Sequence, residues 1–164
     1  MTSTLSIEDI WKLLTEVKDP EIPVLNVVDM GIVRNIQWND DVLEVTITPT
    51  YSGCPAMDVI SLNIKSILHK HFAENVAVKS ALFPPWTTDW LTDDAREKLR
   101  NYGIAPPEKG TSDKSALFAE QKVIECPKCG AKETTKVSEF GSTSCKAHYK
   151  CNVCLEPFDY FKCI

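Results

Sequence analysis

Two cysteine pairs near the C-terminus have the spacing of metal ligands. Cys126 and Cys129 form one C-x-x-C pair, Cys151 and Cys154 form the other, and 21 residues separate the pairs. Each C-x-x-C turn supplies two thiolates from one tight loop, and four thiolates complete a tetrahedron around Zn²⁺ at about 2.3 Å. We therefore expect these four cysteines to hold one structural zinc ion in a zinc ribbon.

The ligand set leaves alternatives open. A rubredoxin-like iron site also uses two C-x-x-C turns and four thiolates. Leu155 rather than Gly follows the second pair, which would leave less room for backbone N–H groups at the sulfur atoms and favours zinc. Cys145 and Cys163 are either small buried residues, or alternative ligands or a redox pair, and His148 could replace a cysteine ligand.

The remaining cysteine, Cys54, lies apart and precedes Pro55, a residue suited to the first position of a helix. The thiol would then lie at or beside a helix N-terminus, where free backbone N–H groups lower the pKa of a thiol. A thiolate there could attack an electrophile or bind a soft metal, with hydroxyl groups supplied by Thr50 and its neighbours. The other interpretation is a small capping residue without chemistry.

A set of carboxylates surrounds the prolines that precede Cys54 in the chain. Asp19 and Glu21 flank Pro20, and Asp29 follows shortly after. Carboxylates can bind iron or act as general acids and bases. They also serve as helix caps and loop charges, and the residue types alone leave both interpretations open.

The pattern of apolar residues predicts the elements that position these side chains, in the order α-β-β-α-β-α. The expected elements are a helix from Ile7 to about Val17, strands Ile32–Trp38 and Val42–Thr48, a helix after Pro55, a strand Val76–Phe83 and a helix from Thr92 to Gly103. This order indicates an α+β fold in which helices pack on one face of a three-stranded sheet.

The chain divides into two modules in the sequence. We expect a first domain at residues 1–105, a linker at 106–120 and a β zinc ribbon at 121–164. The strands of the ribbon are expected at Val123–Glu125, Thr134–Glu139, Ala147–Lys150 and Phe158–Phe161. Because fewer than about 45 residues rarely fold on an apolar core alone, the metal would hold the ribbon together.

Charge and hydropathy exclude several classes of protein. The net charge is −5, and seven Lys against five Asp and Glu from residue 121 onward give the ribbon +2, so the first 120 residues carry −7. Such an acidic first part argues against nucleic acid as the main partner. No apolar run is long enough for a membrane span, and the N-terminus lacks the pattern of a signal peptide. We therefore expect a cytoplasmic protein with no membrane partner.

Three segments of the first domain resemble the metal–sulfur cluster biosynthesis family, which includes SufT-like proteins. They are Asp19–Pro23, Asp29–Val33 and Thr50–Pro55. The resemblance implies a small α/β domain in which Cys54 is functional, together with Asp19, Glu21 and Thr50. It further implies that Cys54 is a transient ligand for iron or an iron–sulfur cluster. One thiolate cannot hold a cluster, so a partner or a second copy of the chain, as in a homodimer, would supply further ligands.

Four later segments extend the resemblance along the chain. Pro84–Trp90, Tyr102–Pro107, Phe140–Lys146 and Glu156–Cys163 resemble the PaaD (PaaJ) family of phenylacetyl-CoA oxygenase, or ring 1,2-epoxidase, systems. The resemblance implies a non-catalytic accessory subunit in aerobic phenylacetate degradation. This subunit would assist maturation of iron–sulfur or di-iron centres in its partners.

The implied partners are the other subunits of the oxygenase complex and iron–sulfur assembly proteins. An alternative function is a structural or electron-transfer subunit of the same complex, with rubredoxin-like iron in the ribbon. A third, a nucleic-acid-binding zinc ribbon, is disfavoured by the charge distribution. Metal analysis would distinguish the first two, because a colourless protein that contains only zinc cannot transfer electrons through the ribbon.

Overall fold

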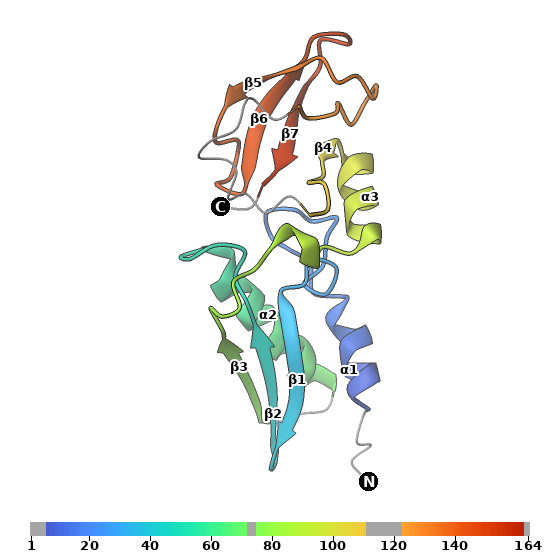
Figure 1. Cartoon of the computed structure of the whole chain (residues 1–164). Coiled ribbons are helices and arrows are strands. Elements are labelled where there is room, and N and C mark those ends of the chain that lie inside the picture. Colours follow the sequence, from blue (N-terminus) through green and yellow to red (C-terminus); the bar gives the residue numbers. More distant parts are fainter. Residues whose placement is uncertain (1–5, 72–74, 111–122, 163–164) are drawn as a thin grey trace. The chain divides into compact units, whose positions relative to one another are not determined.

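The computed structural model describes residues 6–71, 75–110 and 123–162 (Figure 1). The chain forms two compact units, Met1–Trp86 and Thr87–Ile164. The described residues contain three α-helices and two small sheets, which make an α+β fold, as the sequence predicts. None of the described helices has the length and apolar character needed to cross a membrane.

Helix α1, Ile7–Leu14, opens the first unit. Its N-terminus is a capping box: the Asp9 backbone N–H donates to Ser6 Oγ at 3.2 Å, and the Ser6 backbone N–H donates to Asp9 Oδ2 at 3.3 Å. This pairing satisfies two backbone donors that the first turn of a helix leaves without partners. The helix ends earlier than expected, and Val17 is buried in the segment that follows.

The first sheet contains strands β1 (Val33–Asn39), β2 (Val42–Ile47) and β3 (Val76–Ser80). β1 and β2 form the predicted antiparallel hairpin, and β3 lies parallel to β2 on the other side. Parallel neighbours need a crossover connection, which helix α2, Ala56–His71, provides across one face of the sheet (Figure 1). β3 is shorter than expected.

The crossover determines where Cys54 lies. The apolar stripe of α2 is fully buried, as are the inward side chains of β2: Ile60, Ile64, Leu68, Leu43 and Val45. Because β2 and β3 run parallel, their C-terminal ends meet at one edge of the sheet. The segment from the end of β2 to the start of α2, which carries Cys54, leaves from that edge.

The loop that carries Glu21 is fixed by Asp19. Asp19 is buried, with 5% of its surface exposed, and its Oδ1 accepts the backbone N–H groups of Glu21 at 2.8 Å and Ile22 at 2.7 Å. The Asp19 backbone N–H donates to the Leu25 carbonyl at 3.0 Å, beside an antiparallel bridge between Lys18 and Asn26. These bonds hold the loop in one conformation.

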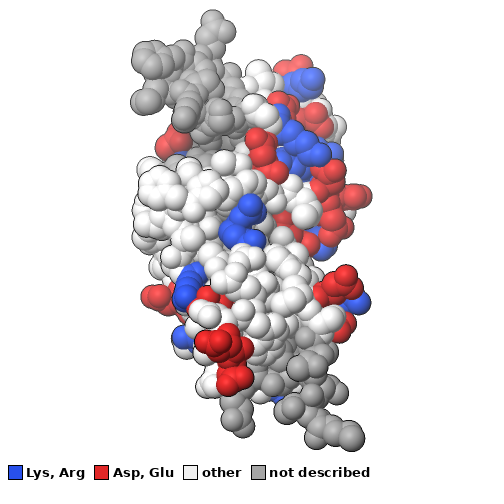
Figure 2. Space-filling model, turned by 60° about the horizontal axis from the view of Figure 1, so that its bottom comes forward, with Lys and Arg blue, Asp and Glu red and all other residues white. Residues whose placement is uncertain are grey.

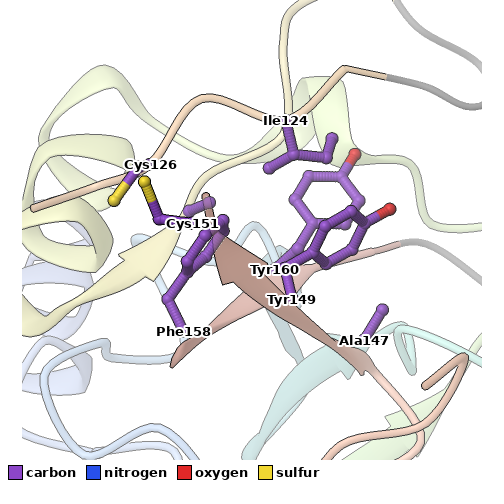
Figure 3. Packing of buried hydrophobic residues seen from close by; sticks show 8 residues of the cluster. Ile124, Cys126, Ala147, Tyr149, Cys151, Phe158 and Tyr160 are labelled. Carbon is purple, nitrogen blue, oxygen red and sulfur yellow. The ribbon is translucent and has the colours of Figure 1, made fainter. Parts of the chain in front are cut away.

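The second unit contains a four-stranded sheet of order β4-β7-β6-β5. Its strands are β4 (Ile104–Ala105), β5 (Thr134–Ser138), β6 (Lys146–Cys151) and β7 (Pro157–Phe161). Figure 3 shows the buried residues that form the core of this sheet. Tyr149 stacks on Phe158 with ring centroids 5.8 Å apart, and it meets Tyr160 edge-on with ring centroids 5.9 Å apart. Two of the ribbon cysteines, Cys126 and Cys151, belong to the same core.

The expected strand at Val123–Glu125 is wrong. Ile104–Ala105 takes the place beside β7 instead and pairs with it in parallel. Ile124 is still buried in the core, and its carbonyl accepts the Thr134 hydroxyl at 2.6 Å. An extended apolar segment can therefore enter the core through side-chain bonds without joining the ladder.

Helix α3, Asp93–Tyr102, and the short 3₁₀ helix η1, Thr88–Trp90, also belong to the second unit. Arg96 of α3 ties this region together, because its guanidinium donates to the carbonyl of Thr88 at 2.7 Å and to that of Pro107. The compact units thus divide earlier in the chain than the sequence modules. The limits 1–105, 106–120 and 121–164 stay a prediction.

Acidic and basic side chains alternate over the surface drawn in Figure 2. Red and blue atoms lie close together there, among large uncharged areas, and no broad area is covered by Lys and Arg alone. Nucleic-acid binding needs a continuous cationic surface. This face has none among the described residues.

We predict that Asp19→Ala destabilises the first unit by about 2–3 kcal/mol, because two buried backbone N–H groups lose a charged acceptor. Urea unfolding measured by circular dichroism would give the free energy of unfolding. Asp41→Ala, at an exposed position of the β1–β2 turn, should change it by less than about 0.5 kcal/mol. Equal stability of the two variants would contradict a role for Asp19 as the anchor of this loop.

Candidate metal centre and thiol site

The four ribbon cysteines converge as the sequence predicts. Their sulfur atoms all lie within 4.8 Å of one another. Cys126 Sγ is 3.8 Å from Cys154 Sγ, and Cys129 Sγ is 3.6 Å from Cys151 Sγ. A tetrahedron with metal–sulfur bonds of about 2.3 Å has edges of about 3.8 Å. The donor set therefore fits a tetrahedral thiolate-bound metal ion.

Backbone N–H groups support the thiolates. The N–H groups of Cys154 and Val153 both donate to Cys151 Sγ at 3.4 Å. Together with hydrogen bonds from the Cys154 and Cys129 thiols, they lower the pKa of Cys151 to about 7. Leu155 adopts a left-handed conformation with φ of +63°, and these bonds form beside it. The Glu156 backbone N–H also hydrogen-bonds to the Cys154 thiol, so a backbone-to-sulfur bond forms after Leu155 as well. The preference for zinc over iron stays a prediction.

The other candidate ligands of the ribbon lie outside the tetrad. Cys145 is buried, with its Sγ 3.1 Å from the Thr143 hydroxyl. His148 Nδ1 lies 3.1 Å from Asp159 Oδ1. Cys163 falls outside the described residues. Of the described cysteine and histidine side chains, only the four in the two C-x-x-C pairs form a group that could hold a metal ion.

Cys54 lies immediately before helix α2. The Cys54 N–H donates to the Tyr51 carbonyl at 3.2 Å, which closes a turn in which Gly53 has a positive φ of +78°. The Cys54 carbonyl accepts the Met57 N–H at 3.2 Å in the first turn of the helix. The thiol is therefore beside a helix N-terminus, as expected, with a partly buried side chain.

The expected lowering of the pKa of Cys54 is wrong. Burial raises this pKa above the ordinary value of 9.0, and the Glu21 carboxylate raises it further. Hydrogen bonds from the Ala56 backbone and from the hydroxyls of Tyr51 and Thr50 lower it, but by less in total. The helix end does favour the thiolate, yet loss of water at a half-buried sulfur disfavours the charged form more strongly. Cys54 is a neutral thiol at pH 7.

The structure brings three of the predicted residues together and gives the fourth another role. Glu21 and Thr50 both act electrostatically on the Cys54 thiol. Asp19 instead holds the loop that presents Glu21. Asp29, an alternative carboxylate, accepts the Asn26 side-chain amide at 2.8 Å within its own loop. The residues able to act chemically at this point are Cys54, Glu21 and two hydroxyls.

The thiol site offers few donor atoms. Within the described parts of the chain, the ribbon tetrad is the only group of three or more His, Cys, Asp and Glu side chains close enough for a metal. Cys54 and Glu21 can therefore contribute at most one sulfur and one carboxylate to a metal. Complete coordination there requires ligands from elsewhere.

Sequence reasoning did not single out Lys128 or Glu156, which form an ion pair across the two C-x-x-C turns at 2.7 Å. The only signal was a lysine between the first two ligands and a glutamate two residues after the last one. Such charges are common on exposed loops, and their pairing depends on the fold.

Two family models match the chain. Residues 7–80 match the iron-sulfur cluster assembly protein model, which covers the first sheet and the Cys54 site. Residues 110–162 match the PaaD zinc beta ribbon domain, which covers the cysteine tetrad.

Known relatives match the whole chain or its first part. A protein of Escherichia coli K12, described as a "Putative 1,2-phenylacetyl-CoA epoxidase" subunit, is 49% identical over 158 residues, which cover 96% of this chain and 93% of that protein. An "Fe-S protein maturation auxiliary factor" of Porphyromonas gingivalis W83 is 34% identical over 56% of this chain and 89% of its own.

A solved structure shares the fold of the first part. A conserved hypothetical protein of Thermotoga maritima is 32% identical, with a TM-score of 0.51 over 60% of this chain and 98% of its own. Together with the match along nearly the full length of the E. coli protein, these findings establish the family. The chain belongs to the PaaD family of phenylacetyl-CoA epoxidase subunits, and joins an iron–sulfur cluster assembly domain to a zinc β-ribbon domain.

Proposed function

We propose that this chain is an accessory subunit of phenylacetyl-CoA epoxidase that assists maturation of an iron–sulfur or di-iron centre in its partner subunits. The observation that carries the proposal is the half-buried thiol of Cys54 beside the N-terminus of α2, with the Tyr51 and Thr50 hydroxyls hydrogen-bonded to it and the charge of Glu21 acting on it. The similarity to a maturation auxiliary factor over this same domain supports it.

The state of Cys54 suits transient binding. A thiol with a raised pKa is protonated at pH 7, so it does not hold a metal until the proton leaves. The neighbouring Glu21 carboxylate can accept that proton as iron, the cargo, approaches the sulfur. Because the described residues offer no group of three or more Cys, His, Asp or Glu side chains at this thiol, the cargo would be bound incompletely and would pass to a site with more ligands.

The ribbon serves a different purpose in this proposal. Its four thiolates fill a tetrahedral coordination sphere and leave no open position, which is the mark of a structural zinc site. Zinc there would fold a small domain whose apolar core is limited, and it would carry out no electron transfer.

The proposed partners are the other epoxidase subunits and iron–sulfur assembly proteins. The description of the E. coli relative as an epoxidase subunit supports the first group, and the family of the first domain supports the second. Further ligands at Cys54 come from one of these partners or from a second copy of this chain.

We predict that Cys129→Ser removes the metal and unfolds the ribbon, while the first sheet stays folded. Structural zinc sites in small domains contribute about 10–16 kcal/mol of apparent binding free energy, so loss of one thiolate has a large effect. Metal analysis of anaerobically purified protein, with hydrogen exchange of both sheets, would measure this. Cys145→Ser, at a buried cysteine outside the tetrad, should keep the metal. Iron in the ribbon of the unaltered protein would contradict structural zinc and favour the electron-transfer function.

The raised pKa of Cys54 predicts slow alkylation at neutral pH. The rate with iodoacetamide should rise with pH to a midpoint above 9.0, because folding favours the protonated thiol. Glu21→Gln removes a charge that raises this pKa, so it should speed alkylation at pH 8 by about two- to threefold. Glu16→Gln, at an exposed position, should leave the rate unchanged. Peptide mass spectrometry gives the rate at Cys54, and a midpoint below 9.0 would overturn this description of the thiol.

The proposed function is tested by producing the epoxidase subunits with this chain or with Cys54→Ala. The variant should fold and join the complex, since it loses one small side chain at a helix start. The iron content and phenylacetyl-CoA turnover of its partners should fall together. Ser52→Ala, in the same turn, is the matched control and should support normal values. Normal iron and turnover with Cys54→Ala would reject a chemical role for Cys54.

A further inference from the structure

An ion pair joins the two cysteine turns of the ribbon. Lys128, between Cys126 and Cys129, places its Nζ 2.7 Å from Oε2 of Glu156, which follows the second turn. Both side chains are half exposed, at 45% and 53%. A pair this exposed adds little stability by itself, so its position relative to the sulfur atoms is what matters.

The Lys128 ammonium group acts on one side of the tetrad. It interacts electrostatically with the thiols of Cys126 and Cys154, whose sulfur atoms are 3.8 Å apart. Four thiolates around a divalent ion leave a net charge of −2, which makes the bound sulfur atoms nucleophilic. A nearby cation reduces the negative potential at those atoms and so reduces their reactivity.

The four cysteines also differ in how deeply they are buried. Cys126 and Cys151 are buried, with 1% and 0% of their surface exposed, and Cys154 is partly buried. Cys129 is exposed. Cys129 is therefore the most solvent-exposed residue of the tetrad, whereas the charge of Lys128 acts on Cys126 and Cys154.

We propose that electrophiles open the ribbon's metal site at Cys129, and that the Lys128 ammonium group restrains this reaction by lowering the negative potential of the tetrad. The inference rests on the metal proposed above for the ribbon. The reaction is a substitution: the Cys129 sulfur forms a bond to the carbon of the electrophile, the leaving group departs with the bonding electron pair, and the resulting thioether binds the metal weakly. Lys128 touches no reacting atom and acts as a positioning and electrostatic residue.

A second exposed lysine, Lys136, provides a charge control: it pairs with Glu139, which also pairs with Lys162 at 2.8 Å, and none of these residues belongs to the tetrad. Lys136 and Glu139 are 2.8 Å apart, with side chains 45% and 55% exposed. They lie in and just after β5 of the same sheet. Lys136→Gln removes one positive charge from the protein, as Lys128→Gln does. It does not change any residue of the two C-x-x-C turns.

The experiment uses the full chain reconstituted with zinc and treated with iodoacetamide, which releases iodide as the new carbon–sulfur bond forms. Zinc release is followed with a chromogenic chelator, and peptide mass spectrometry gives the order in which cysteines are labelled. The zinc content measured before treatment tests separately whether the ribbon binds zinc. A protein that takes up no zinc refutes that assignment, while the rates and order of labelling decide the present inference.

Two variants should change the rate of zinc release in opposite directions, and two should leave it unchanged. Lys128→Gln should speed zinc release by about two- to fivefold at low salt, because a positive charge near the thiolates is lost. Lys128→Arg should keep the original rate. Glu156→Gln should slow release, because the ammonium group is no longer offset by a carboxylate. Lys136→Gln should leave the rate unchanged, and the effect of Lys128→Gln should shrink in 1 M salt.

The same measurements can overturn the inference. If Lys128 only held the two turns together, Lys128→Gln and Glu156→Gln would speed zinc release by the same factor. Lys128→Arg and the control Lys136→Gln would then both leave the rate of zinc release unchanged. Labelling of Cys126, Cys151 or Cys154 before Cys129 would refute the proposal that electrophiles react first at Cys129. If Lys128→Gln takes up no zinc, Glu156→Gln still tests the electrostatic role of Lys128, because that role predicts slower zinc release and a purely structural role predicts faster release.

Discussion

Four sulfur atoms held within 4.8 Å of one another repel when they are ionised, and this repulsion is the constraint on which the ribbon depends. A bound divalent cation would convert this repulsion into attraction. The backbone N–H groups directed at Cys151 and the ion pair between Lys128 and Glu156 moderate the charge that remains. The aromatic core then packs on strands whose ends the metal would fix.

The first domain depends on a different constraint, the parallel pairing of β2 with β3 through α2. This connection places Cys54 at a sheet edge and at a helix N-terminus together. A buried carboxylate, Asp19, fixes a loop distant in sequence, and the charge of Glu21 in that loop acts on the same thiol. The ribbon tetrad thus offers a complete set of four donors, which suits a structural metal. The Cys54 thiol has an incomplete set of donors, which suits transient binding.

Burial decides the chemistry of Cys54. A helix N-terminus favours a thiolate by supplying N–H donors, and that reasoning alone predicts a reactive cysteine. In the folded chain the sulfur is half buried and the negative charge of Glu21 acts on it, and both effects favour the neutral thiol. The same local motif can therefore hold a reactive or a dormant thiol, according to what packs over it.

The sequence by itself determined the elements that local patterns specify: the hairpin of β1 and β2, the helix after Pro55 and the tetrad of Cys126, Cys129, Cys151 and Cys154. Alternating apolar residues and C-x-x-C turns act over a few residues, so they can be recognised without the fold. Only the tertiary structure decided that Ile104–Ala105 joins the ribbon sheet, that Asp19 holds a loop, and that Glu21 and burial raise the pKa of Cys54. Strand partners, desolvation and charge pairs depend on residues far apart in the chain, and they become defined only when the chain has folded.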